Sequence, residues 1–502
     1  MNKSIQDKAP YFQPLVQTLQ GGASHWSRRD FFSRVGDGLC GAALAYLLGR
    51  DLFSPDFAMA AANSAARDLK LRLPHFEAKA KAVIQLFMSG GPSQVDLFDP
   101  KPALEKHAGQ LPRAFLDNVE SVGSAAGLLP SPFKFAKHGQ SGIELSELLP
   151  HLAESVDNVT VIRSMWTSHF NHDPAIFMMN TGRSLPGAPT MGAWAVYGLG
   201  SENQDLPAYV ALDDPKMMII GGIQNWQSGW LPPVYQGTRL RSEGSPLVNL
   251  RPAEELPKPV LEFSRSLLQR LAEDHRSRRP GQPDLEARIA SYELAARMQI
   301  SATDALDVSK ESEPTREAYG LNDPVTASYG RRCLMARRLV ERGVRMVQIF
   351  MNCTGGNNNP WDHHSNIERS LRQSCAETDK AVGALLKDLK RLGLLETTLV
   401  IWGGEFGRLP LSQGGSDPGR DHGANGFSVW MAGGGVKGGT VYGATDEFGY
   451  HAVEDRASIH DLHATVLHLL GLDHEKLVYN HHGLNERLSG VEPAHVIKGI
   501  LA

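Results

Sequence analysis

The sequence predicts an α/β fold in which helices cover a mostly parallel β-sheet. Two short, nearly uninterrupted apolar runs, 82–88 and 397–402, are typical of strands buried on both faces. Between residues 327 and 402 the pattern alternates helix, strand, helix, strand, which is the order of a parallel sheet covered by helices. Both apolar runs end in glycine and polar residues, and such sheets bind ligands beyond the carboxyl ends of their strands.

Composition excludes several classes of function. The 502 residues are 41% hydrophobic and 21% charged, as in ordinary globular proteins, and the formal net charge of −4 favours neither nucleic acid nor an anionic membrane surface as a partner. The four cysteines are too sparse for a disulfide framework, and their spacing fits no zinc module. We expect Cys333, Cys353 and Cys375 to be buried as small apolar side chains.

The N-terminal segment has the order of a bacterial twin-arginine (Tat) export signal. Ser27-Arg28-Arg29-Asp30-Phe31-Phe32 precedes a moderately apolar run, 39–48, and then a small-residue cleavage site, Ala58-Met59-Ala60. The alternative is a surface helix with an incidental arginine pair. We therefore expect 1–60 to be a Tat signal with an N-terminal segment, the Tat machinery to be a partner, and the mature protein to be periplasmic or extracellular. No stretch reaches membrane-spanning length.

The first predicted strands lead into polar loops. After the strand 82–88, the loop 89–100 carries Asp96, which we favour as a functional carboxylate, whereas Asp99 is expected to cap a turn. Residues 145–153 are predicted to be helical, with a break at Pro150.

A second local cluster follows the predicted strand 159–165. His169-Phe170-Asn171-His172-Asp173-Pro174 lies between this strand and a helix-like segment, 175–179. Asp173 before a proline is expected to be an N-cap, so His172 is favoured for chemistry.

Residues 61–502 are expected to form the main domain, with a helical and loop insertion around 200–330 that covers or shapes the site. Helical spacing is visible over 261–300. Beyond the insertion, the pattern predicts two helices and two strands in alternation: a helix at 327–342, a strand at 344–350, a helix at 367–394 and the strand at 397–402. A strand at 427–432 and a helix at 459–470 follow. The arginines of the first helix are expected on its solvated face.

Three motifs in this second half carry imidazoles and carboxylates. They are Trp361-Asp362-His363-His364, Gly403-Gly404-Glu405-Phe406-Gly407-Arg408 and Gly419-Arg420-Asp421-His422. Neutral imidazoles with carboxylates suit Zn²⁺ or Mn²⁺, whereas a cage of oxygens alone would suit Ca²⁺. The predicted metal ligands are Asp362, His364, Glu405 and His422, with Asp96 and Asp421 as further candidates; the alternative is that they are ordinary polar loop residues. Arg408 is placed in the sequence to clamp an anionic oxygen.

Together these motifs resemble the alkaline phosphatase superfamily, and specifically its sulfatase-like bacterial branch DUF1501, over residues 83–502. Ser89-Gly90-Gly91-Pro92-Ser93-Gln94 and the segment 169–174 are part of the resemblance. It implies a large α/β/α sandwich with two divalent metal sites at the strand ends. Zinc is the expected metal, with manganese and calcium as alternatives.

The position of the nucleophile differs from that of sulfatases. The motif Cys-x-Pro-x-Arg, whose cysteine becomes their catalytic aldehyde hydrate, is absent from the sequence. Counting back from Thr181-Gly182, which resembles the end of that motif, the nucleophile position falls at His172. A helix N-terminus and a neighbouring metal both disfavour a protonated imidazole, so a neutral His172 is predicted, acting as ligand, base or nucleophile.

Two functions follow as expectations. The first is an exported, metal-dependent hydrolase of phosphate or sulfate esters, acting on a small anionic ester or on a sulfated or phosphorylated glycan, with catalytic residues His172 and Arg408. The second is a superfamily fold that has lost catalysis and binds anionic glycans or a protein partner after secretion.

Overall fold

The computed structural model describes residues 69–112, 125–215, 218–244, 257–279, 282–351 and 361–502. The chain divides into a unit of residues 1–66 and a unit of residues 67–502, and the described residues all belong to the second unit. The predicted Tat signal, 1–60, therefore lies outside the described residues, as do Cys40 and Cys353.

A nine-stranded sheet forms the centre of this unit, in the order β14-β5-β13-β9-β1-β8-β6-β7, with β17 beside β5. Its strands are β1 (Ala82–Met88), β5 (Val159–Trp166), β6 (Tyr209–Leu212), β7 (Thr238–Leu240), β8 (Met346–Met351), β9 (Thr398–Gly403), β13 (Phe427–Ala432), β14 (Thr440–Tyr442) and β17 (Ala457–Ser458). Strand β13 is antiparallel to both of its neighbours, β5 and β9, and every other pairing is parallel. The predicted, mostly parallel sheet is confirmed.

Strand β1 lies in the middle of the parallel region. All seven of its residues are buried, and it pairs with β8 on one side and β9 on the other, so that Phe87 is opposite both Phe350 and Gly403. A strand with two parallel neighbours and helices on both faces has no solvated side, which explains the nearly continuous apolar run. Its carboxyl end therefore meets those of β8 and β9 at one edge of the sheet.

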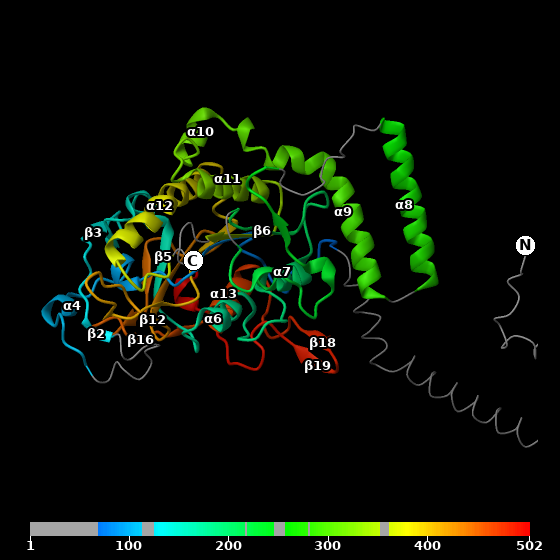
Figure 1. Ribbon diagram of the computed structural model, residues 1–502. Coiled ribbons are helices and arrows are strands. Elements are labelled where there is room, and N and C mark those ends of the chain that lie inside the picture. The colour runs from blue at the N-terminus through cyan, green and yellow to red at the C-terminus, as the bar shows by residue number, and fades with distance from the viewer. Residues whose placement is uncertain (1–68, 113–124, 216–217, 245–256, 280–281, 352–360) are drawn as a thin grey trace, which may run out of the picture. The chain divides into compact units, whose positions relative to one another are not determined.

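Helices cover both faces of the sheet, so the predicted α/β/α sandwich is also confirmed. On one face, Ile84 and Leu86 share a core with α5 (Pro150–Ala153), α11 (Ala327–Glu341) and α12 (Ile367–Arg391). On the other, Val83 and Phe87 share a core with α6 (His172–Thr181), α7 (Met191–Leu199) and α13 (Ile459–Leu469). Figure 1 shows α11 and α12 above the sheet and α6, α7 and α13 below it.

The remaining elements surround this sandwich. The helices are α3 (Gln94–Leu97), α4 (Pro102–Lys106), α8 (Lys258–Arg278), α9 (Pro283–Leu306) and α10 (Glu313–Ala318). The strands are β2 (Ala125–Leu128), β3 (Phe135–His138), β4 (Ile143–Ser146), β10 (Gly407–Arg408), β11 (Leu411–Gln413), β12 (His422–Gly423), β15 (Ala444–Thr445), β16 (Ala452–Glu454), β18 (Tyr479–His481) and β19 (Leu484–Glu486). Among the described residues, no helix is both long enough and apolar enough to cross a membrane.

Two predicted elements are corrected. The helix expected at 145–153 begins only at Pro150, which occupies its first position, where the fixed φ of proline suits a helix start. The residues before it form β4, which pairs with β3. The segment predicted as an insertion, 200–330, contains β6 and β7 of the central sheet as well as the helices α8 and α9.

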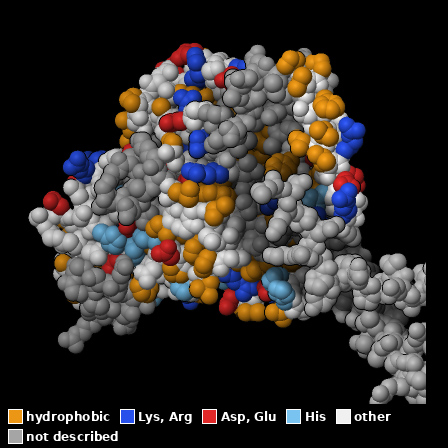
Figure 2. Space-filling model, turned by 45° about the vertical axis from the view of Figure 1, so that its right-hand side comes forward, with side chains coloured by type: hydrophobic (Ala, Val, Ile, Leu, Met, Phe, Trp, Pro, Cys, Tyr) orange, Lys and Arg blue, Asp and Glu red, His pale blue; other side chains and the backbone are white. Residues whose placement is uncertain are grey.

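Helix α8 has exposed apolar side chains at helical spacing, including Val260, Phe263, Leu267 and Leu271. Figure 2, which turns the side of the molecule carrying α8 toward the viewer, shows hydrophobic side chains exposed among charged ones on this face.

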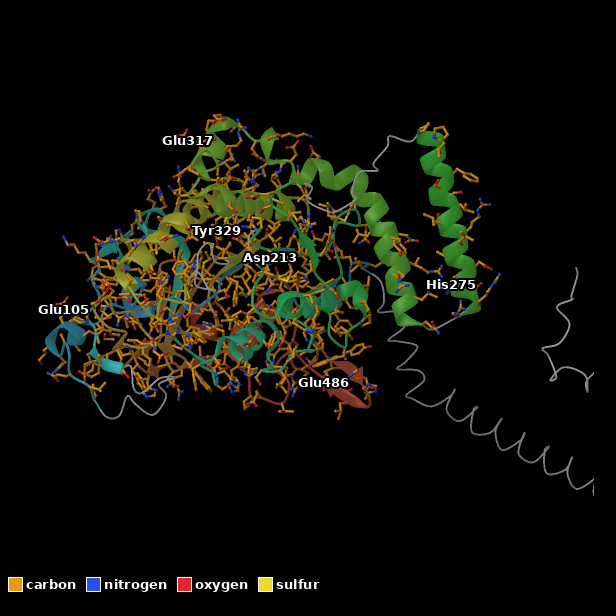
Figure 3. All side chains as sticks on the ribbon, in the orientation of Figure 1. Glu105, Asp213, His275, Glu317, Tyr329 and Glu486 are labelled. Atoms are coloured by element: carbon orange, nitrogen blue, oxygen red, sulfur yellow. The ribbon has the colours of Figure 1, made fainter. Side chains whose placement is uncertain are left out.

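Arg332, Arg337 and Arg338 of α11 are buried and Arg331 is half-buried, so the prediction of a solvated arginine face is wrong. Arg332 is 1% exposed; it donates from Nη1 to the Phe350 carbonyl (2.5 Å) and from Nη2 to Asp214 Oδ2 (2.7 Å). Figure 3 shows the neighbouring Tyr329 in the interior and Glu317 of α10 at the periphery. Arg332 thus links α11 to the ends of β6 and β8, because its guanidinium meets a carboxylate there instead of water.

Candidate metal centre

Four segments that follow parallel strands meet at one edge of the sheet. Strand β5 is antiparallel to β13, which is antiparallel to β9, so β5 runs in the same direction as β9, β1 and β8. The loop after β1 begins at Ser89, and Glu405 follows β9 by two residues. His172 follows β5 at the start of α6, and Asp362 follows β8. The four predicted motifs that contain these residues therefore meet at the carboxyl ends of the strands, where open α/β sheets bind their ligands.

Three histidines and one aspartate form a compact cluster there. His172, Asp362, His364 and His422 offer ligand atoms that all lie within 4.8 Å of one another. Asp362 Oδ1 is 2.8 Å from His364 Nε2 and 3.2 Å from His422 Nε2, and these two nitrogens are 3.0 Å apart. Asp362 Oδ2 is 3.4 Å from His172 Nε2. The cluster thus combines three imidazole nitrogens with one carboxylate.

Two backbone segments bring His364 and His422 together, with ring centroids 4.6 Å apart and the rings tilted by 57°. The two-residue strand β12 pairs with β10, which sets His422 opposite Arg408. The amide of Arg420 donates to the His363 carbonyl (2.9 Å), so the segment before β12 runs beside the segment that carries His364. Their approach requires Gly419, since a Cβ there would lie 2.2 Å from the His364 carbonyl carbon.

The ring of Phe406 forms an apolar wall of the cluster. It packs against His172 and His422, with ring centroids 5.0 Å and 4.6 Å apart. On the other side, His364 Nδ1 lies 2.5 Å from Gln413 Oε1. These contacts limit how far the three imidazoles can turn.

Burial and charge act differently on the members of the cluster. Burial by itself raises the pKa of Asp362, but hydrogen bonds from the three histidines and the charge of Arg408 outweigh it and hold this pKa well below its usual range. Burial, together with the charges of Arg408 and His172, lowers the pKa of His422 to about 3, so this ring is neutral. For His364, burial lowers the pKa, but the hydrogen bonds to Asp362 and Gln413 and the charge of Asp362 together outweigh burial, and the pKa is raised.

His172 differs from the prediction of a neutral ring. Burial lowers its pKa, but hydrogen bonds to Asp362 and Glu405 and their charges outweigh burial and raise the pKa to about 9. The prediction had two grounds, the helix N-terminus and a neighbouring metal. Of these, the helix N-terminus is the weaker influence beside two adjacent carboxylates.

Arg408 requires a correction, because it is not free to clamp a substrate. The residue is 1% exposed, and its guanidinium donates to the carbonyls of Gly90, Gly91 (2.9 Å), Arg420 (3.0 Å) and Trp361 (3.3 Å). Its remaining contact is Asp362 Oδ1, at 2.5 Å. Arg408 therefore holds the loops of the site together and fixes Asp362 from the buried side.

Asp96 and Asp421, predicted as further ligands, lie outside the cluster. Asp96 is fully buried; its two oxygens accept from Nε (2.7 Å) and Nη2 (3.0 Å) of Arg420, and Oδ2 also accepts from Ser93 Oγ (2.5 Å). Asp421 Oδ1 accepts from the backbone amide of His422 (2.8 Å) and is 3.9 Å from His364 Nδ1. We assign both carboxylates structural contacts in place of the predicted metal contacts.

Glu405, the remaining predicted ligand, reaches the cluster only through His172. Its Oε1 lies 2.6 Å from His172 Nδ1 and accepts from the amide of Gly90 at 2.9 Å. Of the four main predicted ligands, Asp362, His364 and His422 come together, while Glu405 contacts His172 and lies outside the group of ligand atoms.

The donor set of the cluster fits one divalent ion. Zn²⁺ accepts imidazole nitrogen and carboxylate oxygen, and ligands of a tetrahedral zinc ion lie about 3.3 Å apart, close to the separations seen here. The resemblance implies two metal sites, but no second group of three or more ligand side chains occurs among the described residues. The residues present therefore fit one of the two expected sites.

The sequence analysis gave no supporting role to Gln413, Phe406 or Arg420, and it took Asp96 for a candidate ligand. In the structure Gln413 and Phe406 contact the cluster, and the Asp96–Arg420 pair holds its loops. Arg420 within Gly-Arg-Asp-His was the available signal, since an arginine between loop residues of a buried site needs a carboxylate partner.

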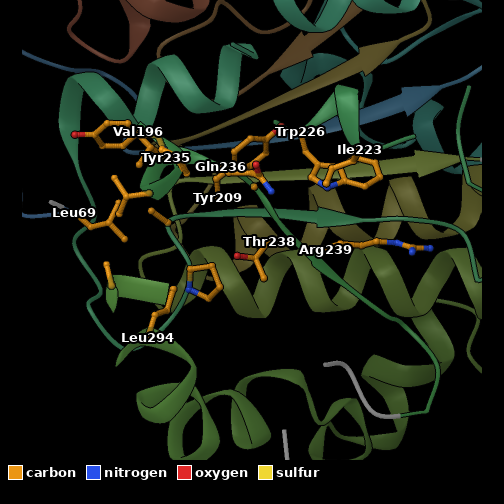
Figure 4. Close-up of a pocket in the computed structure, with 16 residues that line it drawn as sticks. Leu69, Val196, Tyr209, Ile223, Trp226, Tyr235, Gln236, Thr238, Arg239 and Leu294 are labelled. Atoms are coloured by element: carbon orange, nitrogen blue, oxygen red, sulfur yellow. The ribbon is translucent and has the colours of Figure 1, made fainter. Parts of the chain in front are cut away.

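A cavity of about 310 Å³ lies elsewhere, at the amino ends of β6 and β7. Tyr209, Trp226, Tyr235, Thr238 and Leu294 are among its lining residues (Figure 4). Because it opens at the amino ends of strands, it is separate from the metal cluster at their carboxyl ends.

Comparisons with known proteins give three findings. Residues 80–501 match the family model described as "Protein of unknown function (DUF1501)". No curated protein matches the sequence.

Among solved structures, the chain is similar to the lipoteichoic acid synthase LtaP from Listeria monocytogenes, with 10% identity, coverage of 82% of this chain and 78% of that one, and a TM-score of 0.34. It is similar to the PsFucS1 sulfatase from Pseudoalteromonas sp., with 12% identity, coverage of 84% and 73%, and a TM-score of 0.33. It is also similar to the phosphonate monoester hydrolase SpPMH from Silicibacter pomeroyi, with 11% identity, coverage of 78% and 73%, and a TM-score of 0.32.

Proposed function

Because the chain belongs to the DUF1501 family, we propose that it is a metal-dependent hydrolase of phosphate or sulfate esters, the chemistry that its motifs imply. The observation that carries the proposal is the convergence of His172, Asp362, His364 and His422 at the carboxyl ends of the strands. Ion-binding side chains gathered at this edge of a parallel sheet are expected at a site where ligands bind.

In this proposal the four side chains hold one divalent ion, with zinc favoured by three imidazole nitrogens and one carboxylate. The ion would supply Lewis-acid chemistry, which offsets the negative charge that develops on the oxygens of a phosphate or sulfate ester during hydrolysis. His172 then acts as a ligand, because its two ring nitrogens face Glu405 and Asp362. Ligation requires the neutral ring, so His172 gives up its Nε2 proton when an ion binds.

The exposure of the side chains suggests where a substrate would approach. The side chains of His364, Asp362 and His172 are 34%, 18% and 13% exposed, whereas that of His422 is 3% exposed. Arg408 offsets the charge of Asp362 from the buried side. A divalent ion would therefore leave the open side positive, which suits a small anionic ester or a charged glycan.

An assay of ester hydrolysis tests this function. The purified mature chain would be stripped of metal, reloaded with Zn²⁺, Mn²⁺ or Ca²⁺, and given aryl phosphate and aryl sulfate. We expect turnover that depends on the added ion and that falls by at least about 100-fold in Asp362→Asn, since this change removes the only carboxylate of the cluster. Asp417→Asn, an exposed residue of a nearby loop, is the matched control and should keep full activity.

Equal turnover with and without metal would contradict the proposal. Metal binding without turnover of either ester would instead favour the alternative, a family member that binds an anionic ligand without hydrolysing it.

We also propose that the protein is exported by the Tat route before it acts. The support for this is the segment with Arg28 and Arg29, followed by an apolar run and Ala58-Met59-Ala60.

A further inference from the structure

We propose that Glu405 is a positioning residue, which orients His172 toward the metal cluster, and that it is not a metal ligand. This inference rests on the proposed metal centre and deepens it, because it gives a role to a buried carboxylate that contacts the cluster and is not among its four proposed ligands.

The carboxylate of Glu405 is fixed by the protein backbone. The residue is fully buried, and the amide of Gly90 donates to both of its oxygens, at 2.9 Å and 3.2 Å. A fully buried carboxylate requires such donors. Its position is therefore set by the turn after β1.

The two turns that make this contact approach each other closely. Strands β1 and β9 are direct neighbours, and Gly90 and Glu405 each follow their strand by two residues. A Cβ at Gly404 would lie 2.6 Å from the Met88 carbonyl oxygen, so only glycine allows this approach. The sequence Gly403-Gly404-Glu405 thus places the carboxylate between the Gly90 amide and the ring of His172.

The contact with His172 defines which ring nitrogen faces the cluster. Glu405 Oε1 is 2.6 Å from Nδ1, a charge-assisted hydrogen bond that places a proton on this nitrogen. Nε2 then points to Asp362 Oδ2, 3.4 Å away, within the group of ligand atoms. A histidine that binds a metal through one nitrogen commonly donates from the other to a carboxylate, which fixes the ring and raises its basicity.

Substitution of Glu405 separates positioning from ligation. In Glu405→Gln, the amide oxygen can keep the hydrogen bonds of His172 and Gly90 while the negative charge is lost. In Glu405→Ala, both donors lose their partner. Glu147→Gln, a partly exposed glutamate that pairs with Arg372, is the matched control. Circular dichroism of each variant would confirm that the fold is kept.

The readouts are the affinity for Zn²⁺, from competition with a chelator, and the visible absorption spectrum of the Co²⁺ form. We expect Glu405→Gln to bind one ion per chain with a Co²⁺ spectrum like that of the wild type, since the ligand atoms are unchanged, but with an affinity lowered roughly 10- to 100-fold. Glu405→Ala should lower the affinity further if it folds, and Glu147→Gln should not change it.

Two results would overturn this role. Wild-type affinity in a folded Glu405→Ala variant, which removes both hydrogen bonds, would show that this side chain does not position His172. A Co²⁺ spectrum in Glu405→Gln with the changed intensity of a lost ligand would show that Glu405 binds the ion itself. A wild-type chain that binds no ion would overturn the metal centre as a whole, which is a different failure from unchanged affinity in the variant.

Discussion

At the scale of single residues, the site depends on carboxylates that each have a fixed partner. Asp362 meets Arg408, Asp96 meets Arg420, and Glu405 meets the amide of Gly90. A buried carboxylate is tolerated only when donors surround it, and the choice of donor determines its role. Asp362 has an arginine on its buried side and three histidines around it, so it is the carboxylate that we propose as an ion ligand.

The Asp96–Arg420 pair gives the residue-scale prediction. Both side chains are fully buried, so Asp96→Asn would leave the charge of Arg420 without its partner. We expect the free energy of unfolding, measured by urea titration, to fall by about 3–5 kcal/mol, with metal content unchanged.

Glu154→Gln is the matched control for this prediction. Glu154 pairs with Lys387 at the surface, where the side chains are 54% and 49% exposed, so the loss should be within about 1 kcal/mol. A chain that keeps full stability but loses metal in Asp96→Asn would show that the predicted ligand role was right after all.

At the scale of elements, strand ends and glycine turns set the geometry of the site. The loops after β1 and β9 approach each other closely at Gly91 and Phe406. Phe406 in turn packs against His172 and His422. Gly91 has a φ of +80°, and a Cβ there would lie 2.6 Å from the Phe406 ring. The turn therefore supports the imidazoles through a single aromatic contact.

Gly91→Ala tests this support, with Gly109→Ala as its control. Gly109 has a similar φ of +75°, but a Cβ there meets nothing within 4 Å. Both variants incur left-handed backbone strain of about 1–2 kcal/mol. Gly91→Ala should lose a further 1–3 kcal/mol or so through overlap with Phe406 and should bind Zn²⁺ more weakly.

Thermal and urea melts with a zinc-affinity measurement compare the two variants. Equal losses of stability, with unchanged affinity in both, would contradict a role of the Phe406 contact in holding the site.

At the scale of the whole molecule, the sequence predicts the sheet better than it predicts the partners of buried charges. Strands β1, β9 and β13 follow from their apolar runs, because burial on both faces leaves a direct compositional signal. The arginines of α11 look solvated in the sequence, but their partners, such as Asp214, lie far away along the chain. The same limit explains Asp96 and Arg408, whose arginine and carboxylate partners are fixed only by tertiary structure.

In the candidate metal centre, too, some features can be predicted from the sequence and others depend on tertiary contacts. That Asp362, His364 and His422 would meet is predictable from strand order, since each follows a strand or its neighbouring loop. That Glu405 would contact Nδ1 of His172 and not join the ligand atoms depends on the contact of two glycine turns, which no local pattern reveals.

The proposed export signal gives a prediction for the chain that carries residues 1–60. Arg28→Lys with Arg29→Lys should leave the protein in the cytoplasm, because we propose this arginine pair as the address that the Tat receptor reads. Cell fractionation with immunoblotting measures this, and an unchanged periplasmic yield would contradict it. Asp7→Asn, a change well ahead of the arginine pair, is the control and should not alter export.

In the proposed centre, His172, Asp362, His364 and His422 together hold one divalent ion. The metal content of the folded, purified chain, measured by plasma mass spectrometry beside protein concentration for the wild type and Asp362→Asn, tests this directly. We expect close to one ion per chain in the wild type and a large loss in the variant, with the fold kept. A wild-type chain that stays metal-free after incubation with zinc, or an Asp362→Asn chain that keeps its full ion content, would contradict this proposal.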